Sequence, residues 1–308
     1  MAEQKISQPF FSVVIPTYNR EKLIGKTLTT VLQQTCQDFE IIIVDNCSTD
    51  DTVKVLQPFL ADTRIRLHVQ EKNYERSRSR NKGMELATGK FLTFLDSDDL
   101  LYPHALELAL KYANEHTDAR FFHEYYESRD TEGRLVYRYP FPAKGVDLRK
   151  RLFLANFLSC IAVYISRDVY TNYLFDENKA SLGSEDWDFW LRISADHDLG
   201  VIPVVSAAIV QHDERTVAGN RASAIIERKN YYLDKYRNDK TLYNKISTYL
   251  PFFESGFYLY TSTVAWQSRN FGKGYGYLAK ALRRSPSILS SAVFWKIALS
   301  PLKQIFSK

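Results

Sequence analysis

Three carboxylates, Asp96, Asp98 and Asp99, stand close together in KFLTFLDSDDL, residues 90–100. Like charges at this spacing repel one another, and burial would add a desolvation cost. Mn²⁺ or Mg²⁺ would offset the repulsion, because both ions prefer oxygen ligands. The alternative is that Asp98 or Asp99 caps a following helix. An EF-hand loop is excluded, because the sixth position counted from Asp96 is Leu101, where that loop requires glycine.

A second acidic cluster, Glu185, Asp186 and Asp188, opens a segment whose apolar spacing predicts a helix over residues 184–197. A carboxylate in such a place can accept a proton as a general base. Acidic residues are also favoured at helix N-termini by the helix dipole, and that alternative explains Glu185 and Asp188 well. Trp187 lies within the cluster and can either stack on a sugar or fill the core.

Polar side chains also follow two apolar, β-branched runs, at residues 10–16 and 39–45. The second run ends in Asp45. The first leads into a turn whose oxygens and aromatic face could hold a nucleotide base, formed by Pro16, Thr17, Tyr18 and Asn19. A cap on the following helix is an equally good explanation of either position taken alone.

Strand-like and helix-like segments alternate four times with short connections. We expect strands at residues 10–16, 39–45, 65–70 and 90–96, and helices at residues 20–34, 50–60, 76–87 and 103–115. This alternation predicts an α/β fold with a mostly parallel central sheet flanked by helices. Ligands bind such sheets beyond the carboxyl ends of the strands, which is where the polar segments would meet.

The rest of the chain is less regular. Residues 121–139 resemble a hairpin that turns near DTEG, and residues 160–166 and 199–210 are predicted strands. After His212 the apolar spacing predicts a helical region over residues 221–249, 252–270 and 275–306, with breaks at Pro251, Gly272–Gly276 and Pro286.

The composition, 45% hydrophobic and 25% charged, is that of a globular protein. The N-terminus lacks an apolar signal core, and the three scattered cysteines fit a reducing compartment, so we expect a cytoplasmic protein. The net charge of +5 is unevenly placed, because residues 255–308 hold eight Lys/Arg and no Asp/Glu. We expect no nucleic-acid partner.

Four stretches, taken in order, resemble the family 2 glycosyltransferases of the GT-A fold: FSVVIPTYNR, IIIVDNCSTDDT, SRSRNKGMELATGKFLTFLDSDDLLYP and GSEDWDFWLRI. The second departs from the usual Asp-Asp-Gly of that family, because Asp45 is followed by Asn46 and Cys47, but its first acid is kept. The resemblance covers about residues 10–213. It implies a GT-A catalytic domain at residues 1–213, followed by a helical, basic extension at residues 214–308.

The resemblance also implies a nucleotide-sugar donor and roles for the residues at the sheet edge. The nucleotide would be bound by Pro16, Thr17, Tyr18, Asn19, Asp45, Arg80, Asp96 and Ser97. Mn²⁺ or Mg²⁺ would be bound directly by Asp98, with Asp96 on the ribose or a metal-bound water and His212 close by. A surface position for Arg80 and a structural role for His212 remain alternatives.

The family pattern places the general base on Asp186, with Glu185 as its alternative, and Trp187 beside the acceptor. The implied reaction transfers a sugar from a UDP-linked donor, with inversion, to a glycan or lipid-linked acceptor in cell-surface polysaccharide synthesis. Two other classes stay open. One is a catalytically silent sugar-nucleotide-binding protein. The other is a nucleotidyltransferase, which would need a Gly-rich, Arg-containing loop that TYNREKLIGK does not provide.

The segment SPSILSSAVFWKIALSP, residues 285–301, is apolar but too short to span a bilayer. We expect an interfacial helix that places the protein peripherally on the cytoplasmic face of an anionic membrane. Its lipid-facing residues would be Ile288, Leu289, Ala292, Val293, Trp295 and Ile297. Headgroups would meet Lys280, Arg283, Arg284, Lys296 and Lys303. The alternative is that these helices bury their apolar faces against the protein itself.

Overall fold

The computed structural model describes residues 8–142, 144–213 and 221–300. These residues form two compact units, each built from separate stretches of chain. Unit one comprises residues 8–141, 157–177 and 197–213, and unit two comprises residues 142, 144–156, 178–196 and 221–300. The boundary expected after residue 213 stays a prediction, and residues 142, 144–156 and 178–196 belong to unit two together with the residues from 221 onward.

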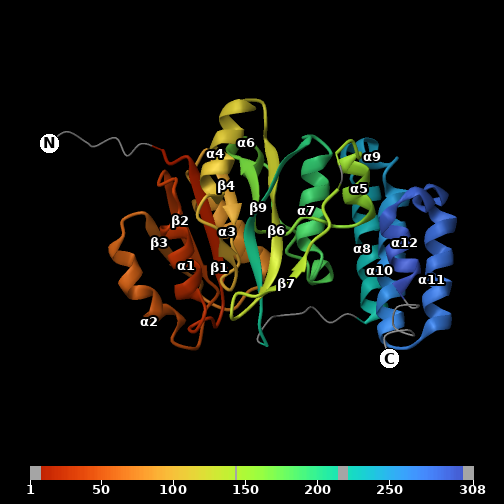
Figure 1. Cartoon of the computed structure of the whole chain (residues 1–308), viewed down its shortest axis with the longest axis horizontal. Coiled ribbons are helices and arrows are strands. Elements are labelled where there is room, and N and C mark those ends of the chain that lie inside the picture. The colour runs from red at the N-terminus through yellow and green to blue at the C-terminus, as the bar shows by residue number, and fades with distance from the viewer. Residues whose placement is uncertain (1–7, 143, 214–220, 301–308) are drawn as a thin grey trace. The chain divides into compact units, whose positions relative to one another are not determined.

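Unit one is built on a mixed sheet with the strand order β3-β2-β1-β4-β8-β6-β9-β5, and β7 pairs with β6 (Figure 1). Strands β1 to β4 are parallel to their neighbours within that group, β6 is parallel to β9, and β8 runs antiparallel between β4 and β6. The strands are β1 (Phe11–Thr17), β2 (Phe39–Asp45), β3 (Ile65–Val69), β4 (Phe91–Phe94), β5 (Leu100–Leu101), β6 (Phe121–Asp130), β7 (Leu135–Arg138), β8 (Val163–Ser166) and β9 (Leu199–Gln211). The predicted α/β fold is confirmed.

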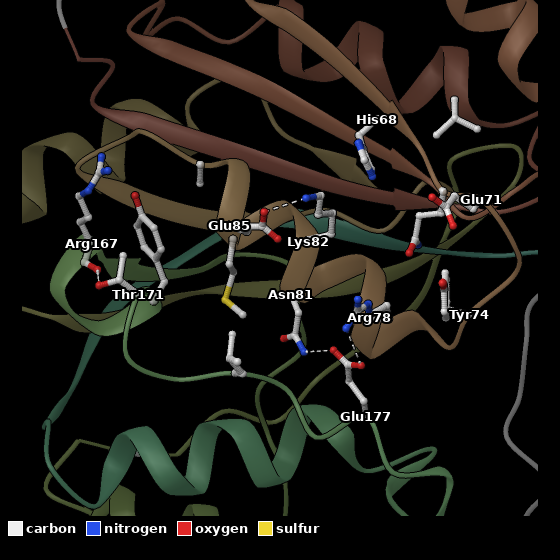
Figure 2. A pocket seen from close by; sticks show the side chains of 16 residues that line it. His68, Glu71, Tyr74, Arg78, Asn81, Lys82, Glu85, Arg167, Thr171 and Glu177 are labelled. Carbon is white, nitrogen blue, oxygen red and sulfur yellow. Dashed lines mark hydrogen bonds and ion pairs between the residues drawn. The ribbon is translucent and has the colours of Figure 1, made fainter.

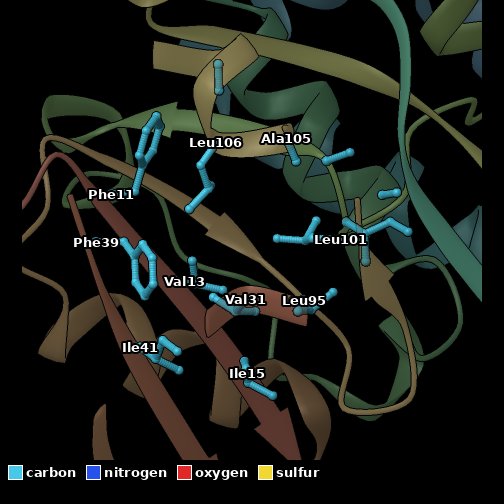
Figure 3. Packing of buried hydrophobic residues seen from close by; sticks show 14 of the residues in the cluster. Phe11, Val13, Ile15, Val31, Phe39, Ile41, Leu95, Leu101, Ala105 and Leu106 are labelled. Atoms are coloured by element: carbon cyan, nitrogen blue, oxygen red, sulfur yellow. The ribbon is translucent and has the colours of Figure 1, made fainter. Parts of the chain in front are cut away.

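The helices of unit one cover both faces of its sheet. They are α1 (Ile24–Leu32), α2 (Thr52–Leu56), the 3₁₀ helix η1 (Gln57–Ala61), α3 (Arg76–Leu86), α4 (Ala105–Glu115) and α6 (Arg167–Tyr170). Successive side chains of a strand point to opposite faces. Phe11, Val13 and Ile15 accordingly join a buried cluster with residues of α1 and α4 (Figure 3). Val14 lies on the other face, against α3.

Unit two is helical. Its elements are α5 (Leu148–Leu154), η2 (Lys179–Ser181), α7 (Glu185–Ser194), α8 (Ala222–Asn238), α9 (Lys240–Ile246), α10 (Leu250–Gln267), α11 (Phe271–Arg284), η3 (Pro286–Ser290) and α12 (Ala292–Ala298). A small core of Leu154, Leu259, Ala281, Ile288 and Phe294 joins α5 to the last helices. Among the residues that the structure describes, no helix combines the length and hydrophobicity needed to cross a membrane.

The segment predicted as one interfacial helix is divided in the structure. Residues 286–290 form η3 and residues 292–298 form α12, with Ser291 as the cap between them. The expected lipid face is wrong in part, because Ile288 is buried and Val293 and Ile297 pack against the same core. Lys303 lies outside the described residues.

Candidate functional site

The first two strands end side by side, because Thr17 of β1 pairs in register with Asp45 of β2. The carboxylate of Asp45 is fully buried. It accepts hydrogen bonds from the backbone N–H of Ser48 at 2.9 Å and from the hydroxyl of Ser48 at 2.5 Å. The side-chain oxygen of Asn19 accepts from the backbone N–H of Thr49 at 2.8 Å. The buried hydroxyl of Thr17 has no hydrogen-bond partner among the described residues, so it can serve a ligand at this edge.

A neighbouring amide cluster was not found by sequence reasoning. The side-chain oxygen of Asn46 accepts from the amide of Gln70 at 3.0 Å and from the backbone N–H of Tyr74 at 2.8 Å. Its side-chain nitrogen donates to the side-chain oxygen of Asn73 at 2.9 Å. Asn46 thus ties the segment after β3 to the end of β2, which explains why asparagine is useful at a position where the family pattern has aspartate.

The acidic loop follows β4 at the same edge. Arg80 is 3% exposed on α3, and its guanidinium lies 3.1 Å from a carboxylate oxygen of Asp96. The backbone carbonyl of Ser97 accepts from the hydroxyl of Thr27 at 3.0 Å, which fixes the loop to α1. Asp99 is fully buried, and its Oδ1 accepts from the backbone N–H of Val210 at 3.0 Å. Ser97 and Asp99 therefore have fixed surroundings.

Helix capping does not account for this cluster. The helix that follows, α4, begins at Ala105 with His104 as its cap, and β5 lies between. The alternative in which Asp98 or Asp99 caps that helix is therefore wrong.

The carboxylate of Asp98 is the meeting point of two distant segments. His212, at the end of β9, places its Nε2 3.0 Å from Oδ2 of Asp98, and Arg20 places its Nε 3.4 Å from the same oxygen. An imidazole nitrogen and a carboxylate oxygen are both donors that could hold a divalent cation. Within residues 8–142, 144–213 and 221–300, no group of three or more His, Cys, Asp or Glu forms a complete metal site by itself.

The second acidic cluster belongs to unit two. Asp186 accepts a hydrogen bond from the amide of Asn156 at 3.1 Å, and Glu185 accepts from the backbone N–H of Gly183 at 2.7 Å. The indole N–H of Trp187 donates to the carbonyl of Leu152 at 2.7 Å. Trp187 is only 8% exposed, so the structure gives it a core environment, and its role at the acceptor stays a prediction.

Asp188 is a structural hub that the sequence did not reveal. Its buried carboxylate accepts from Arg192 at 2.9 Å, from Lys235 at 3.0 Å and from the hydroxyl of Tyr236 at 2.9 Å. Burial and the neighbouring Asp188 raise the pKa of Tyr236 well above its usual value, so this phenol stays a donor. The contacts fix α7 to α8, and they show that Asp188 is engaged in structure.

A cavity of about 730 Å³ in unit one is lined by residues from β3, α3 and α6 and the loop after α6 (Figure 2). None of the residues predicted to bind nucleotide is among its lining residues. Glu177 accepts from Asn81 at 2.8 Å and pairs with Arg78 at 3.3 Å, and Lys82 pairs with Glu85 at 2.8 Å (Figure 2).

The strand order and the acidic edge define a GT-A glycosyltransferase fold. The chain superposes on S. aureus TarS in complex with UDP-GlcNAc with a TM-score of 0.66 and 19% identity, over 89% of this chain and 81% of that one. A mannosyltransferase from Pyrobaculum calidifontis in complex with GDP-Man and Mn²⁺ superposes with a TM-score of 0.58 and 15% identity, over 98% of this chain and 89% of that one. At these identities the likeness shows the fold alone.

The sequence model of glycosyl transferase family 2 matches residues 12–174, and the chain belongs to this family. It is 38% identical over 109 residues to a Campylobacter jejuni GalNAc(5)-diNAcBac-PP-undecaprenol beta-1,3-glucosyltransferase, which is 35% of each chain. The chain spans about a third of the length of the first curated relatives that it matches, 29% to 33%.

Proposed function

We propose that this protein is an inverting, metal-dependent glycosyltransferase that moves a sugar from a UDP-linked donor to a glycan or lipid-linked acceptor in cell-surface polysaccharide synthesis. The observation that carries the proposal is the meeting of His212 with Asp98, 114 positions apart in sequence, beside the pair formed by Arg80 and Asp96. These side chains gather at the carboxyl edge where β1 and β2 also end. The name of the Campylobacter jejuni relative supports a lipid-linked acceptor.

The chemistry assigns one task to each group. Thr17, Asn19 and Asp45 hold the base and ribose, and Arg80 offsets nucleotide charge. Asp98 and His212 would hold Mn²⁺ or Mg²⁺, which when bound supplies Lewis-acid neutralisation of the diphosphate.

In the transfer step, the acceptor hydroxyl oxygen forms a bond to the anomeric carbon as the bond from that carbon to the diphosphate breaks. The nucleoside diphosphate leaves with the bonding electrons, and the stereochemistry inverts. Asp186 accepts the hydroxyl proton as general base. Asn156 donates to its carboxylate and thereby orients it.

The experiment measures UDP release from a panel of UDP-sugars with Mn²⁺ and with EDTA. The wild type should hydrolyse one donor slowly in a metal-dependent manner, and a silent binder would only bind it. Asp98→Asn should lose metal-dependent UDP binding and remain folded. Asp186→Asn should keep donor binding and lose about 10²–10⁴-fold in turnover, the size of general-base effects.

Two results would contradict the proposal. Mn²⁺-dependent UDP binding that is unchanged in Asp98→Asn would remove the metal assignment. A larger loss of turnover in Glu185→Gln than in Asp186→Asn would assign the base to Glu185 instead. A nucleotidyltransferase would consume a nucleoside triphosphate and a sugar phosphate, and release of pyrophosphate from that mixture would identify it.

A peripheral position on the cytoplasmic face of a membrane would suit a lipid-linked acceptor. Between Ser255 and Ser300 there are six Lys/Arg and no Asp/Glu, a balance that favours an anionic surface. All three cysteines, Cys36, Cys47 and Cys160, are free thiols.

A further inference from the structure

Arg20 is a charged residue at the site to which the proposed function gives no task. Its Nε lies 3.4 Å from Oδ2 of Asp98, the oxygen that also faces Nε2 of His212 at 3.0 Å. The side chains of Arg20 and Asp98 are only 15% and 10% exposed. An ion pair this far from solvent is weakly screened, so it is worth more than an ordinary surface pair.

The chain holds Arg20 in this position by several contacts. Its backbone N–H donates to the hydroxyl of Thr52 at 2.7 Å, and its guanidinium donates to the carbonyls of Asn19 at 3.1 Å and Tyr18 at 3.5 Å. Asn19 adopts a positive φ of 50°, which turns the chain sharply between β1 and α1. The guanidinium is therefore part of a constructed turn, with donors left to reach Asp98.

We propose that Arg20 is the counter-ion of Asp98 in the metal-free protein and that it competes with the divalent cation for this carboxylate. This inference rests on the proposed function, because it takes Asp98 as a metal ligand. Metal binding to the free protein must displace an arginine from Oδ2, which weakens the metal's affinity. Without a replacement partner, the displaced guanidinium would lose its ion pair with Asp98 in a site of low exposure.

The same competition couples the metal to the nucleotide. A diphosphate offers the displaced guanidinium a new anionic partner, since arginine recognises phosphate oxygens through its planar fork of donors. The metal and the nucleotide then favour each other's binding, and the coupling is equal in both directions. Arg20 thereby disfavours a site loaded with metal alone and favours one loaded with metal and donor together.

The test measures free Mn²⁺ by electron paramagnetic resonance in titrations of the whole protein, with and without UDP, and needs no turnover. Arg20→Gln keeps a donor for the neighbouring carbonyls and removes the charge. It should bind Mn²⁺ about tenfold more tightly in the absence of UDP, which corresponds to losing one well-placed ion pair. The factor by which UDP tightens Mn²⁺ binding should fall by a similar amount.

Two further variants make the result specific. Arg20→Lys keeps the charge on a flexible stem without the planar fork, so its Mn²⁺ affinity should fall between those of the wild type and Arg20→Gln. Arg78→Gln removes an arginine from an ion pair of 3.3 Å with Glu177 in the same unit, and it should bind Mn²⁺ like the wild type. Melting curves in EDTA establish that each variant is folded.

If the wild type binds Mn²⁺ and UDP but both Arg20 variants bind Mn²⁺ no more tightly than it does, the role of Arg20 is wrong and the proposed function is unaffected. A wild type that binds no Mn²⁺ even with UDP would overturn the metal assignment in the proposed function as well. The two failures are therefore distinguishable.

Discussion

Two titratable residues, His123 and Glu124, are buried side by side on β6. Burial raises the pKa of Glu124 to about 8, opposed by hydrogen bonds from the hydroxyls of Ser206 and Tyr164. Burial lowers the pKa of His123 to about 4. Both groups are therefore neutral in the folded protein near neutral pH, because the interior disfavours either charge.

This pair predicts a loss of stability in mild alkali. The folded-state pKa of Glu124 lies above its unfolded value of 4.5. Its contribution to the free energy of unfolding is therefore complete below pH 4.5 and is lost as the pH rises to about 8. His123 acts in the opposite direction, but only below pH 6.5. Between pH 6.5 and 8 Glu124 acts alone, and stability should fall by about 2 kcal/mol.

Thermal melts of the wild type and Glu124→Gln at pH 6.5 and above pH 8 measure this effect. The neutral amide cannot ionise. Between the two pH values, the melting temperature of the variant should therefore fall by about 4–8 °C less than that of the wild type. Glu85→Gln, at an exposed carboxylate, is the control and should follow the wild type. Parallel curves for wild type and Glu124→Gln would contradict the assigned protonation state.

Three of the residues that the sequence placed at the site lie at or shortly after the end of a strand: Asp45 ends β2, Asp98 lies in the loop after β4, and His212 follows β9. Parallel strands bring such positions to one edge. Arg80 on α3 and Asp186 on α7 do not follow this rule. Arg20 and Asn73 lie in turns whose geometry depends on contacts from other segments. Their places could not be predicted, because spacing along the chain says nothing about the distant segments that they contact, Asp98 for Arg20 and Asn46 for Asn73.

At the scale of elements, the distance between α3 and β1 decides where Arg80 lies. Gly83 faces β1, and a Cβ added there would lie 2.1 Å from a methyl carbon of Val14. Arg80 is three positions earlier, on the same helix face, and reaches Asp96 at 3.1 Å. The glycine thus permits a close approach that gives the arginine its reach.

Gly83→Ala should therefore weaken both stability and nucleotide binding. The added methyl group must push α3 away from β1, at a cost of about 1–3 kcal/mol for overpacking, and must draw Arg80 away from Asp96. Thermal melts and UDP titrations measure the two effects. The matched control is Gly25→Ala in α1, where the nearest atom lies 3.8 Å away and alanine should be neutral or slightly stabilising. Equal UDP affinity in both variants would refute this account of α3.

Element prediction was accurate where burial sets a clear period and failed where tertiary contacts set the structure. The first four strands and their helices follow the predicted order, with ends shifted by a few residues. β5 has only two residues, Leu100 and Leu101, and exists because β9 pairs with it. α6 is a single turn of four residues, Arg167–Tyr170, too short to show an apolar period.

At the scale of the whole molecule, the chain crosses between its two units more than once. Residues 142–156 and 178–196 leave the sheet unit and join the helices, and α7 carries the predicted base with them. The boundary expected after residue 213 follows the end of the family resemblance, and neither that resemblance nor the basic bias of residues 255–308 indicates the two earlier crossings. The hub at Asp188 is the physical reason that α7 groups with α8.

The C-terminal helices leave an apolar and basic surface exposed. Leu289, Trp295 and Leu299 are 46–49% exposed, and the indole N–H of Trp295 donates to the carbonyl of Leu289 at 2.7 Å. Lys296 is exposed, and the guanidinium of Arg284 lies 2.6 Å from a carboxylate oxygen of Glu254. The lipid contact stays a prediction, which now rests on the exposed Leu289 and Trp295 and not on the buried Ile288.

This exposed surface predicts binding to anionic membranes that depends on both apolar and basic side chains. In co-sedimentation with phosphatidylcholine vesicles, with and without phosphatidylglycerol, the wild type should bind the anionic vesicles preferentially.

Lys296→Gln should weaken that binding about fivefold, because each cation near such a surface contributes about 1 kcal/mol. Trp295→Ser should weaken it on both kinds of vesicle, since aromatic rings favour the interface. Val136→Ser, at an apolar residue that is 55% exposed on β7, is the control. Binding that ignores lipid charge, or equal losses in all three variants, would show that this surface serves another purpose.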